Sequence, residues 1–233
     1  MALIEHARSA PAQPQAMSPP RRRTSPLACS LELASGLVLL GGAALAGAIF
    51  VRRPWENRLD VLAYSLVPAR PSSPLYLDIA RLGSTGVFLA GVAVLTVLAL
   101  FRDRARALAC AVGPLLAVLV TERVAKPLVA RHGVLGGDSY PSGTVTAVAA
   151  LVTGIVLVSP RLLRPLTTVV GLGVIVAVGV AVVGLRWHYG TDAVGGLLVG
   201  CGAVFSVDAL AHVPGLVVAR LHSDCNNEDD SRV

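Results

Sequence analysis

Residues 165–207 have the sequence PLTTVVGLGVIVAVGVAVVGL, followed by RWHYGTD and then AVGGLLVGCGAVFSV. The first and last blocks contain no Asp, Glu, Lys, Arg or His, whereas the short segment between them contains one Arg, one His and one Asp. An apolar block of about 20 residues can cross the hydrocarbon core of a bilayer as a helix, and the shorter last block reaches this length if its flanks continue the helix. The stretch therefore predicts two membrane helices joined by a polar loop.

The same alternation of apolar blocks and polar segments extends through most of the chain. The six blocks that lack all five of those residue types are approximately 33–51, 84–101, 107–120, 143–158, 165–185 and 193–207. The 233 residues are 54% hydrophobic and only 15% charged, against roughly 25% charged in soluble domains. Gly196 and Gly200 have the four-residue spacing that lets membrane helices approach closely. We therefore predict an all-α integral membrane protein, a bundle of six transmembrane helices.

The segments outside these blocks predict the domain organisation and the orientation. Residues 1–30, rich in Pro, Ser, Ala and Arg, predict a disordered cytoplasmic tail. Residues 31–215 are predicted to form the six-helix membrane domain, and residues 216–233 a polar cytoplasmic tail. Short basic segments before the first block and after the second and fourth place both termini in the cytoplasm, as expected for a multi-pass protein of the cell membrane. Apolar faces within residues 52–83 predict short helices that lie in the membrane interface of the first outer loop.

The charge and the cysteine pattern argue against two other classes of function. The net charge is +6, but the basic residues lie between the apolar blocks instead of forming one stripe, so no nucleic-acid partner is expected. The four cysteines show no paired spacing that would indicate a disulfide framework or a zinc site. Of the 20 basic residues only Lys126 is a lysine, which singles it out for attention.

Three polar clusters, 126–132, 140–144 and 186–192, lie between the apolar blocks. Each cluster follows an odd-numbered block, so all three lie on the same side of the membrane in either orientation. With both termini in the cytoplasm, that side is the outer face. The arrangement predicts one site at a membrane surface instead of a pathway across the membrane.

The last cluster contains the pair that carries chemistry. His188 and Asp192 are four residues apart and stack on one face if the sixth helix begins near His188. The carboxylate can then bind one ring nitrogen and leave the other as a base or nucleophile. The alternative is that Asp192 is a helix N-terminal acid favoured by the helix dipole and that His188 is an ordinary interfacial residue.

The other two clusters contain groups suited to an anion. The Pro-Ser-Gly sequence at 141–143 places a hydroxyl and backbone N–H groups at a helix N-terminus, which favours phosphate, although it is also an ordinary turn and cap. Lys126 and Arg131 can neutralise phosphate oxygens. The alternative for Lys126 is a helix ion pair with Glu122, four residues earlier.

Over about residues 55–205, these clusters in this order resemble the type 2 phosphatidic acid phosphatase family, which is related to the vanadium haloperoxidases. That family carries Lys, six residues and Arg-Pro; later Pro-Ser-Gly-His; and later Ser-Arg, five residues, His, three residues and Asp. Lys126 is similar to the first Lys, residues 141–143 to the middle motif, and His188 and Asp192 to the last pair.

The chain departs from the family pattern at several positions. The family's Arg-Pro falls on residues 133–134 and its Ser-Arg on residues 181–182, and neither pair is present here. Arg131 resembles an additional Arg found in some members, and Arg186 is placed to supply a guanidinium from another backbone position. The largest departure is Thr144, which stands where the family has the His that protonates the leaving group.

The resemblance implies a membrane lipid phosphatase that works in two steps without a metal or other cofactor. His188 would attack phosphorus to form a phosphohistidine and Asp192 would orient it. The phosphate would be held by Lys126, Arg131, Ser142, Gly143, Thr144 and Arg186. Because Thr144 cannot protonate an alkoxide near neutral pH, a polyprenyl diphosphate, whose leaving group is a phosphate, fits more easily than a substrate similar to phosphatidic acid.

Three alternatives accompany this hypothesis. One is a catalytically weak or silent relative that binds lipid phosphate headgroups or serves as a scaffold, and another is a small transporter, which the uncharged apolar blocks disfavour. The third is a metallohydrolase that uses Asp138, His132, His188 and Asp192, without a tight ligand spacing to support it. The expected partner is the membrane lipid substrate. No soluble partner is evident from the sequence. A homodimer is the one alternative to a monomer.

Overall fold

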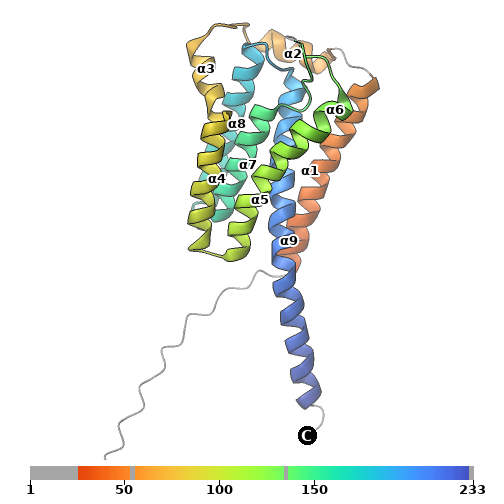
Figure 1. The fold of residues 1–233 in the computed structure, drawn as a ribbon, viewed down its shortest axis with the longest axis vertical. Coiled ribbons are helices and arrows are strands. Elements are labelled where there is room, and N and C mark those ends of the chain that lie inside the picture. Colours follow the sequence, from red (N-terminus) through yellow and green to blue (C-terminus); the bar gives the residue numbers. More distant parts are fainter. Residues whose placement is uncertain (1–25, 53–55, 134–135, 231–233) are drawn as a thin grey trace, which may run out of the picture.

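The computed structural model describes residues 26–52, 56–133 and 136–230, with side chains described in these ranges apart from 51–52 and 214–230. All regular elements of the described residues are helices, so the prediction of an all-α fold is confirmed (Figure 1). In chain order the elements are α1 (Pro26–Arg52), α2 (Arg58–Leu66), α3 (Pro74–Ala80), η1 (Arg81–Gly83), α4 (Thr85–Leu100), α5 (Arg104–Val120), η2 (Thr121–Ala125), α6 (Lys126–Val129), α7 (Gly143–Val158), α8 (Arg164–Gly184) and α9 (Gly190–Asp230).

Four helical segments are long and apolar enough to cross a membrane, namely Pro26–Phe50, Arg104–Val129, Arg164–Gly184 and Gly190–Val213. A fifth is added if Pro74–Gly83 and Thr85–Leu100, which meet at a 44° bend, form one span. The remaining apolar helix, α7, is shorter. Each of the six predicted apolar blocks lies almost entirely within a helix, but six membrane crossings stay a prediction.

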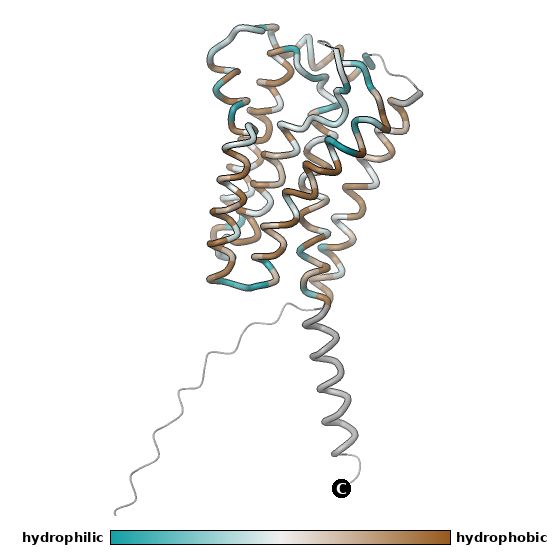
Figure 2. The backbone as a smooth tube through the Cα atoms, viewed as in Figure 1, coloured by the Kyte–Doolittle hydropathy of each residue, from teal (hydrophilic) through white to brown (hydrophobic). Residues whose placement is uncertain are grey.

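The surface of the bundle agrees with a lipid environment. Large apolar side chains point outward along its helices, for example Val38 on α1 and Val169 on α8, which are 73% and 68% exposed. Figure 2 shows hydrophobic residues along the helices and hydrophilic residues concentrated towards the ends of the bundle. Water would penalise such a surface, whereas hydrocarbon accepts it.

Helix α9 forms the centre of the bundle and contacts α1, α5 and α7. Where α9 crosses α7, a Cβ atom on Gly196 would lie 2.6 Å from the carbonyl oxygen of Ser142. A Cβ atom on Gly200 would lie 2.6 Å from the carbonyl oxygen of Thr146. The two glycines therefore allow the close approach that their spacing predicts, and this contact sets the N-terminus of α7 beside the start of α9.

The first long loop contains the predicted short helices, α2 and α3, at the end of the bundle that also carries α6 (Figure 1). Asn57 caps α2 by accepting hydrogen bonds from the N–H groups of Leu59 and Asp60 at 2.8 and 3.0 Å. Ser73 caps α3 in the same way, and Pro74 occupies its first turn. The location of these helices in the membrane interface stays a prediction.

The two ends of the chain differ from the predicted boundaries. Helix α1 begins at Pro26, inside the segment 1–30 that composition assigned to a tail. The reason is local, since proline suits the first position of a helix and the Ser30 hydroxyl donates to the Pro26 carbonyl at 3.0 Å. Helix α9 continues to Asp230, through most of the segment predicted as a C-terminal tail. Residues 1–25 and 231–233 lie outside the described residues, so the prediction for them stays a prediction.

Candidate functional site

The structure brings the three polar clusters together at one end of the bundle. The first cluster is on η2, α6 and the segment after them, the second opens α7, and the third joins α8 to α9. The Ser142 N–H donates to the Asp192 carbonyl at 3.0 Å, which links the second cluster to the third. Arg131 donates to the Asp192 carboxylate at 2.6 Å, which links the first cluster to the third.

A wide helical turn positions the first cluster. In η2 the N–H of Lys126 donates to the carbonyl of Thr121, five residues earlier, in place of the usual four. Pro127 follows at once; its ring has no N–H to donate and crowds the carbonyl four residues before it, which favours widening here. Such turns are frequent at functional sites. In this protein the turn directs Glu122, Arg123 and Lys126 toward one cavity.

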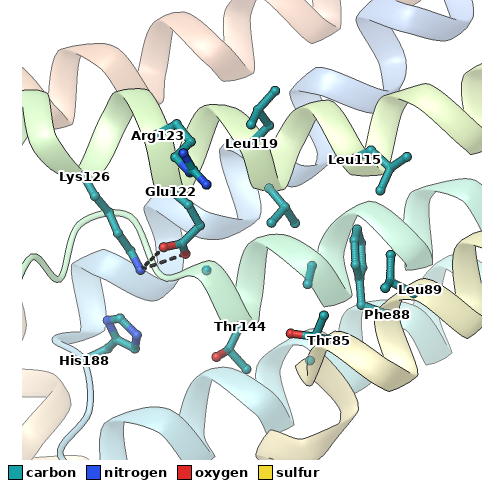
Figure 3. Close-up of a pocket in the computed structure, with 14 residues that line it drawn as sticks. Thr85, Phe88, Leu89, Leu115, Leu119, Glu122, Arg123, Lys126, Thr144 and His188 are labelled. Carbon is teal, nitrogen blue, oxygen red and sulfur yellow. Dashed lines mark hydrogen bonds and ion pairs between the residues drawn. The ribbon is translucent and has the colours of Figure 1, made fainter.

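This cavity has a volume of about 490 Å³ and lies between α4, α5, α7 and the α8–α9 connection (Figure 3). Its polar end is formed by Glu122, Arg123, Lys126, Gly143, Thr144 and His188. Its apolar end is formed by Phe88, Leu89, Leu115, Val118, Leu119 and Ala147. The cavity is therefore amphipathic along its length, with charge at one end and hydrocarbon at the other.

At the polar end, Lys126 is paired with Glu122. The Lys126 ammonium donates to both carboxylate oxygens of Glu122, at 2.7 and 2.8 Å. The Lys126 side chain is 19% exposed and that of Glu122 is 41% exposed, so solvent screens the pair. The ion pair that the four-residue spacing predicts is thus present, and Lys126 faces the cavity as well.

His188 lies two residues before α9, and Asp192 lies in the first turn of that helix. Nδ1 of His188 is 3.6 Å from Oδ2 of Asp192, which is an ion-pair distance but longer than a hydrogen bond. Among the described residues Nδ1 has no hydrogen-bond partner, and catalytic hydrogen bonds are often this long before a substrate binds. Asp192 is fully buried and held in place, since its Oδ2 accepts from the Tyr189 N–H at 3.0 Å. The ring nitrogen turned away from Asp192 is Nε2.

Arg131 holds Asp192 from the other side. It is fully buried, with Nη1 2.6 Å from Oδ1 of Asp192 and Nη2 2.5 Å from Oδ2 of Asp60 on α2. Its guanidinium lies between the rings of Phe50 and Tyr189, 4.1 and 4.2 Å from their centroids. One cation thus balances two buried carboxylates from two different helices.

Helix α2 also holds the loop that carries His188. Arg186 adopts a left-handed backbone conformation, with φ of +62°, and its guanidinium lies 3.9 Å from the centre of the Tyr64 ring. The Tyr64 hydroxyl donates to the His188 carbonyl at 3.4 Å. Burial raises the pKa of Tyr64 to about 12, so this hydroxyl keeps its proton at neutral pH.

The predicted site residues therefore divide into two groups. Lys126, Gly143, Thr144 and His188 line the cavity. Behind it lie four that support the first group: Asp192, Arg131, Ser142 and Arg186. Ser142 is fully buried and caps α7, its hydroxyl accepting from the Val145 N–H at 3.5 Å. His132, a candidate metal ligand, is exposed and pairs with Asp138 through the backbone, away from the cavity lining.

Sequence reasoning missed two charged residues of this region. Arg123 lines the cavity, and its position three residues before Lys126 is the signal that indicates a shared helix face. Asp60 completes the buried network, and it also accepts from the Thr191 N–H and hydroxyl at 3.0 and 2.7 Å. Its only local signal is the capping box at the start of α2, which does not indicate a distant partner.

Fold and site together are those of a membrane-type bundle of apolar helices in which a histidine, 3.6 Å from a buried aspartate, faces an amphipathic cavity with charged residues at one end. Residues 120–209 match the family model described as the PAP2 superfamily. The matched region contains Lys126, Gly143, His188 and Asp192, in agreement with the resemblance to the type 2 phosphatidic acid phosphatases. No curated protein and no solved structure matches the chain.

Proposed function

We propose that this protein is a lipid phosphatase of the cell membrane that hydrolyses a lipid phosphate or a polyprenyl diphosphate through a phosphohistidine on His188. Superfamily membership of residues 120–209 supports a phosphatase of lipids in general terms. The observation that carries the finer proposal is the cavity itself, in which His188 shares one end with Lys126 and the first residues of α7.

The polar end of the cavity suits a phosphate group. Lys126 and Arg123 supply positive charge, and Gly143 opens α7, where free N–H groups and the helix dipole favour an anion. Thr144 adds a hydroxyl that can donate a hydrogen bond. Arg131 is fully buried and binds two carboxylates and the Thr191 hydroxyl, so we assign it to the positioning of Asp192. We likewise assign Ser142 and Arg186 to positioning.

The apolar end of the cavity suits the lipid chain. Phe88 and Leu89 come from α4, and Leu115 and Leu119 come from α5, so this end lies between two helices of the bundle (Figure 3). A lipid whose phosphate sits at the polar end has its first methylene groups against these side chains. These side chains are as apolar as the lipid tails of the bilayer, so the methylene groups keep an apolar environment when the phosphate sits at the polar end.

The chemistry then follows in two steps. Nε2 of His188 attacks phosphorus, while Asp192 stabilises the positive charge that develops on the imidazole. Lys126, Arg123 and the N–H groups of α7 stabilise the charge on the phosphoryl oxygens in the transition state. Water then cleaves the phosphorus–nitrogen bond and releases inorganic phosphate. The arginine-rich loops at the opposite end support an outer-face location for this chemistry.

The experiment measures phosphate released by the detergent-solubilised protein from a lipid phosphate and from a polyprenyl diphosphate, with a chelator present. The wild type should release phosphate from at least one substrate. His188→Ala should be inactive on both because the nucleophile is gone. Glu56→Ala, a change at an exposed residue outside the cavity lining, is the control for folding and should keep wild-type activity.

Two results would contradict the proposal. If the wild type is at background and Thr144→His brings activity, the protein is a silent relative that has lost its proton donor. If the chelator alone stops turnover, the reaction depends on a metal ion, and His188 is not sufficient as the nucleophile.

A further inference from the structure

The cavity lacks the proton donor that the superfamily resemblance would place at residue 144. The hydroxyl of Thr144 is far too weak an acid to protonate an alkoxide leaving group near neutral pH. Among the described residues that line the cavity, Glu122 is the only carboxyl group and His188 is the only imidazole. Because His188 is the proposed nucleophile, Glu122 is the remaining candidate for a proton donor among these lining residues.

The Glu122 carboxylate lies against the residue that precedes Thr144. A Cβ atom on Gly143 would overlap Oε1 of Glu122 and would lie 3.7 Å from Nζ of Lys126. The absence of a side chain at Gly143 therefore lets this carboxylate reach the N-terminus of α7. The carboxyl group comes from η2 instead of α7, yet it lies beside the position at which the family's imidazole is expected.

The carboxyl group of Glu122 lies in the cavity but comes from η2, next to the N-terminus of α7. In Figure 3 the Glu122 carboxylate and the Lys126 ammonium point toward each other at the end of the cavity that also contains Thr144 and His188. His132, the other imidazole of this region, is exposed and does not line the cavity. Glu122 is thus the cavity residue that is placed to give a proton to the oxygen of the leaving group.

We propose that Glu122 is the proton donor for the leaving group, an inference that rests on the proposed phosphatase function. Before the substrate binds, both oxygens of Glu122 accept from Lys126. A phosphoryl group in the cavity competes for the ammonium and places negative charge beside the carboxylate. The Glu122 carboxyl group, released from Lys126, can then face the leaving oxygen.

The proton and electron pairs balance over the two steps. The lone pair of Nε2 of His188 forms the nitrogen–phosphorus bond, the phosphorus–oxygen bond to the lipid breaks, and its electron pair stays on the lipid oxygen. The Glu122 carboxyl proton passes to that oxygen, which leaves as an alcohol. In the second step Glu122 takes a proton from water, whose oxygen attacks phosphorus, and the nitrogen–phosphorus bond breaks to free His188.

The test compares two substrates with the same polyprenyl chain, a monophosphate and a diphosphate. The monophosphate expels an alkoxide and needs a proton donor, whereas the diphosphate expels a phosphate and needs it far less. Glu122→Gln keeps the shape of the side chain but cannot give up a proton. Glu56→Gln is the matched control, since Glu56 is exposed and lies outside the cavity lining.

Glu122→Gln should lower kcat/KM for the monophosphate by about 100-fold or more and that for the diphosphate by less than about 10-fold. Glu56→Gln should change neither value. Both substrates are measured on the same preparation, so a smaller folded fraction cannot alter their ratio. In the double variant Glu122→Gln/Thr144→His, the new imidazole should restore much of the monophosphate activity.

Other outcomes would overturn the inference. An equal loss on both substrates would mean that Glu122 acts only on Lys126 or on the fold, and a gain on both would mean that it blocks the phosphate position. No change on either substrate would remove it from the reaction. A wild type with no His188-dependent release from either substrate overturns the proposed function itself, and this inference falls with it.

Discussion

Arg131 is the residue on which the geometry of the site depends most. Its single guanidinium is fully buried against the carboxylates of Asp60 and Asp192, which come from α2 and α9. A buried ion pair brings little net stability, but the removal of one partner leaves the other charge without compensation. Under the proposed function, Arg131 is therefore a positioning residue that holds Asp192 beside His188.

Arg131→Met should destabilise the protein by about 3–5 kcal/mol, because two buried carboxylates lose their counter-ion. The matched control is Arg81→Met, which removes an arginine from an exposed pair with Asp78, where the side chains are 73% and 64% exposed. Such pairs contribute about 0–1 kcal/mol. Unfolding of both variants in the same detergent gives the comparison. Equal losses would show that the Arg131 network is no more important than a surface pair.

At the residue scale, the proximity of His188 and Asp192 could be predicted from their four-residue spacing, although His188 lies just before α9 and not within it. The same spacing predicts the ion pair of Lys126 and Glu122. The network of Arg131 could not be predicted, because Asp60 lies 71 residues earlier in the chain and the two meet only when α2 folds over the start of α9. No periodicity in the sequence encodes such a contact.

At the scale of the elements, the crossing of α7 and α9 sets the distance between the two halves of the site. Helix α7 carries Gly143 and Thr144 into the cavity, and α9 begins beside His188 and carries Asp192. The backbones approach closely at Gly196, where no side chain separates them. The width of the cavity therefore depends on a position that itself has no functional group.

Gly196→Ala should lower stability by about 1–3 kcal/mol through overpacking, and should lower the rate of phosphate release as the helices move apart. Gly173→Ala on α8 is the matched control, because no atom lies within 4 Å of the position of the added Cβ. Thermal unfolding in detergent and phosphate release together measure both effects. If the two alanine variants behave alike, the close crossing is not what positions the site.

The helices themselves follow from the sequence with few exceptions, since each apolar block lies almost entirely within one. The wide turn η2 is the main feature that hydropathy does not predict. Its hydrogen bond between residues five apart depends on how Pro127 is accommodated near the end of a long helix. The average hydropathy of the segment does not indicate this hydrogen bond. The spacing of Arg123 and Lys126 indicates a shared helix face, but the sequence does not show that the wide turn directs this face into the cavity.

At the scale of the whole molecule, the two ends of the bundle differ in charge pattern. The end opposite the site carries arginines in the α4–α5 and α7–α8 connections, at Arg102, Arg104, Arg106, Arg161 and Arg164. Arg106 donates to the Leu157 carbonyl at 2.7 Å, so part of this charge also ties the two connections together. Short basic loops are retained on the cytoplasmic side of a membrane, so these two connections predict an outward-facing site.

Labelling of single cysteines in intact cells tests this orientation. In a variant with the four native cysteines replaced, His132→Cys places an exposed thiol near the site, and Arg102→Cys places one at the opposite end. A maleimide that cannot cross the membrane should label the cysteine at 132 directly and the one at 102 only after permeabilisation. The reverse pattern would put the site in the cytoplasm.

The amphipathic shape of the cavity has a consequence for the fate of the products. Under the proposed function, the dephosphorylated lipid would have the apolar end of the cavity between α4 and α5 beside it, and inorganic phosphate would have the charged end. The two fragments would then leave in opposite directions, the lipid toward hydrocarbon and the phosphate toward water. Their re-encounter is suppressed by dilution in two separate phases, so hydrolysis on this protein would run as a one-way step.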